Sequence, residues 1–270
     1  MRARTHIIFF LALLTGSIFI FSRCTDFIAN VDRQEEWEKR DSGKVCLYYR
    51  AKGFSSSPSP GAAVAQQIVQ NQNLYYQAIL DTLEEDFSDK VLIYLYNEDE
   101  AEELTGTNTG GHAIPKYNAY YYTYLFDRRP FTDQYEVDNP VIGAHELVHV
   151  ITHRVLGYPG TKLMSEGYAV WLDGMYAGYS IDDIIRKYRD EEKEKLMVPD
   201  ELLNERVDKE SVYYPNAGML VRFLAHYYGV VNINRIFSSS RADLKEHFRQ
   251  VTGESWENMS RRYGQYINEL

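Results

Sequence analysis

The stretch His145-Glu146-Leu147-Val148-His149, HELVH in one-letter code, is the most informative part of this sequence. Residues four apart on an α-helix lie about 40° from each other around the axis, so both imidazoles leave the same face one turn apart. Two nitrogen ligands in that arrangement can share one Zn²⁺ ion, and the glutamate between them can reach a metal-bound water without binding the metal. The alternative is coincidence, in which two helical histidines happen to flank a charged residue.

The flanks of HELVH favour a helix that begins before it. Asp138-Asn139-Pro140 supplies a capping side chain and then a proline at the first helical position. Gly157-Tyr158-Pro159 is typical of a helix end. We therefore expect a helix from Pro140, with apolar residues recurring at helical spacing: Val141, Ile142, Ala144, Val148, Ile151 and Val155.

Glu166 is the candidate for a third metal ligand. A catalytic zinc held by two histidines needs one more protein ligand and an open fourth position. Sixteen residues lie between His149 and Glu166, enough to finish one helix, turn and begin another. Ser165 can cap that second helix, which would leave Glu166 in its first turn, facing the histidines. The alternative is that an acid in a first turn only complements the helix dipole.

Together these motifs resemble the gluzincin metallopeptidases. HExxH followed by Ser165-Glu166-Gly167-Tyr168-Ala169 is similar to the compact peptidase MA-like domains, and more distantly to aminopeptidase-N-like enzymes, where a Glu-Gly-aromatic-Ala segment carries the third ligand. The segments 214–229 and 248–256 also resemble that family. The resemblance covers roughly residues 44–268, and only the two metal segments are specific. It implies a zincin-like α+β fold with one zinc ion per chain, held by His145, His149 and Glu166.

The remaining roles in such a site follow from its chemistry. Glu146 is expected to act as general base on the zinc water and then to carry the proton to the leaving amine. In the resembled family a tyrosine just before a helix stabilises the oxyanion, and Tyr214 is the expected donor. Tyr213 is its rival, about 100° away on a helix, and core packing would explain either tyrosine.

Two further residues near the motifs have less definite roles. Asp173 lies seven residues beyond Glu166 on nearly the same helical face, where it could hold a ligand imidazole or face solvent. His153 continues the spacing of the two histidines by one more turn. Because three successive turns diverge too far to meet one ion, we expect His153 to be a packed or surface histidine.

The N-terminus is typical of an exported protein. Arg2 and Arg4 precede an uncharged apolar run over residues 7–21, as in an export signal, although an uncleaved anchor is also compatible. Cys24 would be the acylated residue of a lipoprotein, or an incidental cysteine after a plain signal. If Cys24 is not lipidated it could pair with Cys46 in an oxidising compartment.

The rest of the chain predicts an α+β protein of 270 residues. We expect a signal or anchor at 1–24, a linker at 25–43 and a peptidase domain at 44–270, with its sheet part up to about 138 and the metal helices and a helical lobe from about 139. Strands are predicted at 45–50, 90–96 and 118–126, and a helix at 62–87; everything after the metal helices reads as helix. In the resembled family an edge strand like 118–126 lies above the metal and pairs with substrate, and the metal lies in a cleft between the two parts. His112, just before that strand, is read as a loop or surface histidine.

These features predict a zinc peptidase that hydrolyses peptides or proteins outside the cytoplasm. The formal net charge of −10, with no basic stripe to offset it, argues against nucleic-acid binding. Contact with a membrane is expected only through the N-terminal anchor. The alternatives are a catalytically inactive, membrane-tethered binding module with the same fold, and a zinc hydrolase acting on a non-peptide amide.

Overall fold

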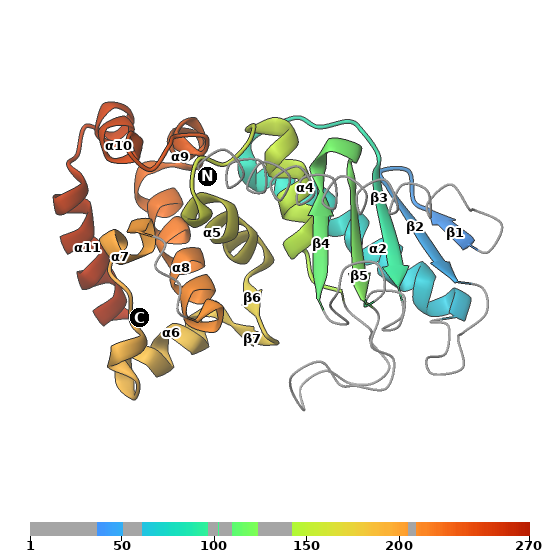
Figure 1. Cartoon of the computed structure of the whole chain (residues 1–270), viewed down its shortest axis with the longest axis horizontal. Helices are drawn as coiled ribbons and strands as arrows, with labels where there is room; N and C mark the ends of the chain where they lie inside the picture. The colour runs from blue at the N-terminus through green and yellow to red at the C-terminus, as the bar shows by residue number, and fades with distance from the viewer. Residues whose placement is uncertain (1–36, 51–60, 97–101, 103–109, 124–141, 205–208) are drawn as a thin grey trace, which may run out of the picture.

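The computed structural model describes residues 37–50, 61–96, 102, 110–123, 142–204 and 209–270 (Figure 1). The expected signal segment, most of the expected linker and the predicted Asp138-Asn139-Pro140 cap lie outside the described residues. Among the helices that are described, none is both long and apolar enough to span a bilayer.

In the N-terminal part, the residues that the structure describes form a mixed sheet of five strands, in the order β1-β2-β3-β5-β4 (Figure 1). Its centre is parallel: β2 (Val45–Arg50), β3 (Val91–Tyr96) and β5 (Ala119–Thr123). The edge strands β1 (Trp37–Asp41) and β4 (Gly111–Ile114) pair antiparallel with their neighbours. The three predicted strands are thus confirmed, with β3 and β5 each beginning one residue later than predicted, and the α+β class is confirmed with them.

Both edges of the sheet correct the sequence-based prediction. Residues 37–41, expected in a charged linker, form β1, whose register with β2 runs from Trp37↔Arg50 to Asp41↔Cys46. Charged side chains are common on edge strands, so the charge pattern did not separate a strand from a linker. The tyrosine-rich β5 is not an edge strand, because β4 lies outside it. His112 is accordingly in a strand, with its side chain exposed.

The two faces of the sheet bury different side chains. Leu47, Ile93 and Tyr120 belong to the main hydrophobic core, together with residues of α2 (Gly61–Leu83) and α4 (His145–Val155). Tyr94 and Tyr96 point to the opposite face, where they form a smaller aromatic cluster. The sheet and α2 therefore support α4, the helix that carries the HExxH motif.

The C-terminal part is mostly helical and shares the main core (Figure 1). One short hairpin, β6–β7, interrupts a region that was predicted to be helical throughout, which corrects that prediction. The described residues also include two short 3₁₀ turns, η2 (Pro115–Tyr117) and η3 (Lys193–Lys195). The remaining elements are α5 (Lys162–Asp173), β6 (Met175–Tyr176), β7 (Tyr179–Ser180), α6 (Ile181–Asp190), α7 (Pro199–Asn204), α8 (Glu210–Tyr228), α9 (Val230–Ile236), α10 (Leu244–Thr252) and α11 (Trp256–Glu269).

Helix α8 begins earlier than the sequence suggests and contains a proline. Tyr214, expected just before a helix, lies inside α8, one residue before Pro215. A proline inside a helix cannot donate to the carbonyl four residues earlier, here that of Ser211. The Tyr188 hydroxyl donates to that carbonyl instead, at 3.2 Å. The helix can therefore continue through Pro215 without an unsatisfied carbonyl at this point.

Helices α5 and α8 cross at very short range. A Cβ added to Gly167 would lie 2.5 Å from Val221 Cγ2, and one added to Gly218 would lie 2.5 Å from Val170 Cγ1. Only glycine at both positions lets the two backbones approach this closely. This contact fixes the position of α5, and with it Glu166, against α8.

Candidate metal centre

Helix α4 brings His145 and His149 together as the HExxH spacing predicts. Their Nε2 atoms lie 3.2 Å apart, and both rings are partly buried. The helix itself begins at His145, with Ala144 as N-cap, so residues 142–144 are not the helical turn that was expected from Pro140 onward. His145 is therefore in the first turn of α4 and His149 in the second.

Helix α5 contributes Glu166. Its Oε2 lies 3.3 Å from His145 Nε2 and 3.4 Å from His149 Nε2. The cap of α5 is Thr161, whose hydroxyl accepts a hydrogen bond from the Met164 N–H at 3.2 Å, not Ser165 as expected. Glu166 consequently lies in the second turn of α5. The alternative, an acid in the first turn that only complements the helix dipole, does not fit this position.

The three ligand atoms have the separations that a tetrahedral zinc site requires. Bonds of about 2.0–2.1 Å to nitrogen and oxygen place tetrahedral ligand atoms about 3.3–3.4 Å apart. The observed separations are 3.2, 3.3 and 3.4 Å. Among the described residues, His145, His149 and Glu166 are the group whose side chains could hold a metal ion. The sequence and the geometry agree on this set.

Hydrogen bonds and charges within the same three residues shift the pKa values of His145 and Glu166. Burial alone would lower the pKa of His145, but the hydrogen bond with Glu166 and the charges of nearby acids outweigh it and raise this pKa. Burial would raise the pKa of Glu166, but hydrogen bonds from His145 and His149 hold it well below its usual value. Glu166 is thus a carboxylate at neutral pH, as a metal ligand must be.

Two polar groups lie next to the ligands. Ser165 Oγ is 3.5 Å from His149 Nδ1, the ring nitrogen that does not face Glu166. Asp173 does not bond to an imidazole in the structure, nor does it simply face solvent; its Oδ1 accepts a hydrogen bond from the Ala144 N–H at 2.7 Å. Burial raises the pKa of the Asp173 carboxyl, against the opposing effects of that hydrogen bond and of His145.

The side chain of Glu146, on α4, lies against the edge strand β4. A Cβ added to Gly111 would lie 2.6 Å from Glu146 Cγ and 3.0 Å from its Oε1. The Gly111 backbone thus forms one wall against the Glu146 side chain. The edge strand beside the candidate site is therefore β4, whereas β5, which the sequence-based expectation treated as an edge strand, lies one position further into the sheet.

Tyr213 and Tyr214 differ sharply in their surroundings. The Tyr213 side chain is fully buried, and its hydroxyl donates to the Leu202 carbonyl at 3.0 Å. The ring of Tyr214 is partly exposed, with its centroid 6.3 Å from that of His145. Its hydroxyl donates to Glu210 Oε1 at 3.3 Å. Of the two tyrosines, Tyr214 is the one that faces the histidines.

His153 is not part of the metal group. Its ring packs between those of His149 and Tyr158, with centroids 6.2 and 5.4 Å away. Both ring nitrogens are buried, and no described residue gives either of them a hydrogen bond. Burial, with a smaller contribution from His149, lowers the pKa of His153 to about 4. His153 is therefore a packed, neutral histidine at physiological pH.

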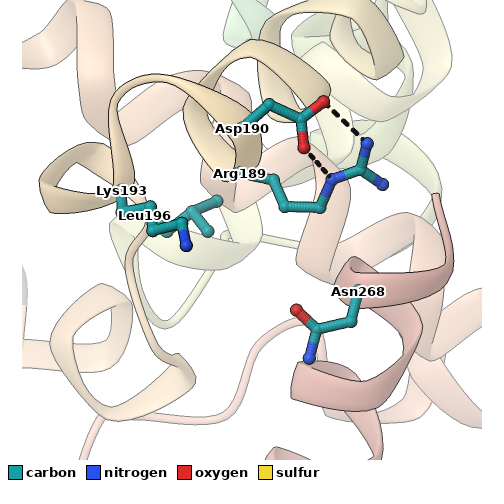
Figure 2. A pocket seen from close by; sticks show the side chains of 5 residues that line it. All are labelled: Arg189, Asp190, Lys193, Leu196 and Asn268. Atoms are coloured by element: carbon teal, nitrogen blue, oxygen red, sulfur yellow. Dashed lines mark hydrogen bonds and ion pairs between the residues drawn. The ribbon is translucent and has the colours of Figure 1, made fainter.

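A pocket on the helical part lies apart from these residues (Figure 2). Arg189 and Asp190 form a two-point ion pair at its edge, with hydrogen bonds of 2.7 and 2.9 Å. Its other lining residues are Lys193, Leu196 and Asn268. None of the five belongs to the candidate metal centre, and the cleft expected at the metal stays a prediction.

Comparisons with known protein families and with curated proteins identify no relative of this chain. No model of a known protein family matches the chain, and a search of curated proteins finds no match either. The structure itself shows an α+β fold and a group of two histidines and a glutamate that is consistent with an HExxH-type metal site.

Several residues around the site carry no sequence signal of their own. Gly111 and Gln72 come near the metal helix only through the pairing of β4 and the packing of α2. Thr161 is a capping residue type like Ser165, and sequence spacing gave no reason to choose it. Such contacts depend on how distant segments pack, and local patterns do not encode that.

Proposed function

We propose that this protein is a zinc-dependent peptidase. The observation that carries the proposal is the near-equal spacing of His145 Nε2, His149 Nε2 and Glu166 Oε2, with Glu146 on the same helix as the two histidines. Two imidazoles and one carboxylate form a donor set suited to a catalytic zinc, because three protein ligands leave one position for water or substrate. When bound, zinc would lower the pKa of a water molecule and polarise the scissile carbonyl.

Glu146 acts as the general base in this proposal. It follows His145 on α4, its charge contributes to the raised pKa of His145, and it is not one of the three residues of the metal group. From there it takes the proton of the attacking water and delivers it to the leaving amine. A binding module with the same fold would not need an acid at this position.

Tyr214 acts as the oxyanion donor. Its ring is the tyrosine ring that faces His145, and its hydroxyl reaches Glu210 at the partly exposed side of α8. Burial raises the pKa of Tyr214, followed by the charges of Glu166 and Glu210, so the hydroxyl stays protonated at neutral pH. A protonated phenol can donate to the oxygen that gains charge in the transition state.

The substrate is an extended peptide that pairs with β4. This strand is at one end of the sheet order, and its Gly111 backbone contacts Glu146. An extended chain added to a sheet edge is recognised through its backbone, so the pairing demands no particular sequence. We also propose, from the N-terminal sequence alone, that the enzyme acts outside the cytoplasm and is anchored or released there.

The proposal is tested with the full-length protein, its Glu146→Gln variant and a peptide library. We expect wild-type protein to cleave peptides and to stop when a chelator removes the metal. Glu146→Gln keeps the ligands, so it should retain zinc but lose hydrolysis by at least about 10²-fold. Binding of peptides without any cleavage by zinc-loaded wild-type protein would instead identify a binding module, and cleavage of non-peptide amides alone would change the substrate class.

A further inference from the structure

Three residues just before the first ligand are held by side chains from distant parts of the chain. Ile142, Gly143 and Ala144 precede α4 and lack regular structure, and Ala144, the N-cap, makes no side-chain capping bond. Their polar backbone groups nevertheless have specific partners. These partners are the basis of an inference that goes beyond the ligands themselves.

Gln72 binds two of the three carbonyls of this segment. Its Nε2 donates to the Ile142 carbonyl at 2.8 Å and to the Gly143 carbonyl at 3.1 Å. The Gln72 side chain is fully buried in the middle of α2, and its Oε1 accepts a hydrogen bond from the Tyr120 hydroxyl at 2.6 Å. Both ends of the amide are thus bonded. A buried polar group satisfied in this way has one preferred orientation, because any rotation would leave a donor or acceptor unpaired.

Asp173 binds the same segment from the other side. Its Oδ1 accepts the Ala144 N–H at 2.7 Å, so the last residue of α5 reaches the N-cap residue of α4. A carboxylate at a helix N-terminus also interacts favourably with the helix dipole. Helix α5 also carries Glu166, which lies close to His145 and His149 on α4. The bond between Asp173 and Ala144 is therefore a further polar contact between these two helices.

We propose that Gln72 and Asp173 are positioning residues that fix the first turn of α4, and thereby His145 and Glu146, relative to His149 and Glu166. Apolar packing holds α4 from Leu147 onward, since Leu147 and Val148 at the end of the first turn and Val150 and Ile151 in the second are all fully buried. His145 and Glu146 lie between this packed stretch and residues 142–144, which have the polar contacts. Loss of those contacts should therefore shift His145 and Glu146 while His149 stays in place.

The inference rests on the metal site proposed above, and zinc affinity measured by competition with a chromophoric chelator tests it. Gln72→Leu and Asp173→Ala should each lower zinc affinity by about 10- to 100-fold, the range typical of residues that orient metal ligands. Asp173→Asn keeps an oxygen acceptor for the Ala144 N–H and should restore most of the affinity. In Co²⁺-substituted protein, the absorption bands of the metal should shift in Gln72→Leu and Asp173→Ala, and return toward wild type in Asp173→Asn.

Asn216 provides the matched control. It is also a fully buried amide that donates to two backbone carbonyls, those of Lys195 at 2.9 Å and Val212 at 2.8 Å. Asn216→Leu should cost stability without changing zinc affinity, which separates positioning from general destabilisation. If Gln72→Leu does not fold, Tyr120→Phe removes only the bond to Gln72 Oε1 and should give a smaller loss of affinity in the same direction.

The outcomes distinguish the inference from the proposed function. Failure of wild-type protein to bind zinc would overturn the metal site itself. Normal zinc binding by wild type, with unchanged affinity and unchanged cobalt spectra in the Gln72, Tyr120 and Asp173 variants, would overturn the positioning role alone. A loss of affinity in Asn216→Leu equal to that in Gln72→Leu would also overturn it.

Discussion

Tyr213 and Tyr214 are adjacent in α8, yet their hydroxyls lie in different surroundings and have different hydrogen-bond partners. Tyr213 donates to a backbone carbonyl inside the core, whereas Tyr214 lies near His145. Its neighbours include Lys162, whose Nζ is 5.1 Å from the centre of the Tyr214 ring. The sequence offered both tyrosines as oxyanion donors, and the proposed role now falls on the one whose ring faces the site.

Replacement of each hydroxyl separately should show this difference. Tyr214→Phe should lower kcat by about 10²-fold with little change in KM, because an oxyanion donor acts mainly in the transition state. Tyr213→Phe is the control: it should leave kcat near wild type and cost about 1 kcal/mol of stability for the lost hydrogen bond. Steady-state kinetics and urea unfolding of both variants provide the measurement. Equal kcat values for the two variants would remove Tyr214 from the proposed mechanism.

Gly111 determines how closely β4 can approach the proposed general base. Gly111→Ala would put a methyl group within 2.6 Å of Glu146 Cγ and within 2.8 Å of Tyr122 Cδ2, so the Glu146 side chain has to move. We expect kcat to fall by about 10²-fold, the effect typical of a misplaced catalytic group, while bound zinc stays at the wild-type level.

Gly264→Ala is the control for Gly111→Ala. Gly264 is on α11, and nothing lies within 4 Å of the Cβ that alanine would add there. This variant should keep both kcat and zinc content. A wild-type kcat in Gly111→Ala would mean that Glu146 does not depend on the position of β4.

At the scale of elements, the crossing of α5 and α8 holds the third ligand. Gly167→Ala would place its Cβ 2.5 Å from Val221 Cγ2 and 3.0 Å from the Ala217 carbonyl oxygen. We expect this overpacking to cost about 1–3 kcal/mol of stability and to lower zinc affinity through Glu166.

A second substitution can relieve most of that clash. Val221→Ala removes the methyl group nearest to the new Cβ, although it also leaves a small cavity. The double variant should therefore be more stable than the sum of the two single effects predicts. Strictly additive free energies of unfolding, from urea titrations of the four proteins, would show that the helices do not meet as described.

The elements also show which parts of the fold local sequence could predict. The helix predicted at 62–87, the strands predicted at 45–50 and 90–96 and the pairing of HExxH with Glu166 all have their own spacing signals. The structure has them, although the helix ends at Leu83, four residues earlier than predicted, and the second strand begins at Val91. The edge strands β1 and β4 have no such signal in the local sequence. An edge is defined by which strands pair, and that pairing depends on residues far apart in the sequence.

The start of α4 is a second example of a non-local choice. Local sequence favours a helix from Pro140, since the Asp-Asn-Pro signal and the apolar spacing agree. In the structure α4 begins only at His145, and residues 142–144 before it are bonded to Gln72 and Asp173. Contacts from α2 and α5 thus outweigh the local preference, and neither contact is visible in the sequence around the helix.

At the scale of the whole molecule, one core joins the sheet and the helical part around the candidate site. The ligands come from two helices, with α4 supported by the sheet and α5 supported by α8. A metal bound at this junction would link the two parts, and ligand binding to the folded state alone stabilises it.

Zinc binding by the full-length protein tests the central claim most directly. Equilibrium dialysis followed by metal analysis should find one zinc per wild-type chain, and one in the control Glu246→Gln, whose carboxylate pairs with Arg249 on α10. Glu166→Gln, which keeps the shape of the side chain but removes its charge, should lose the bound zinc. Wild-type protein without zinc, or Glu166→Gln with zinc bound as tightly as in wild type, would contradict the account.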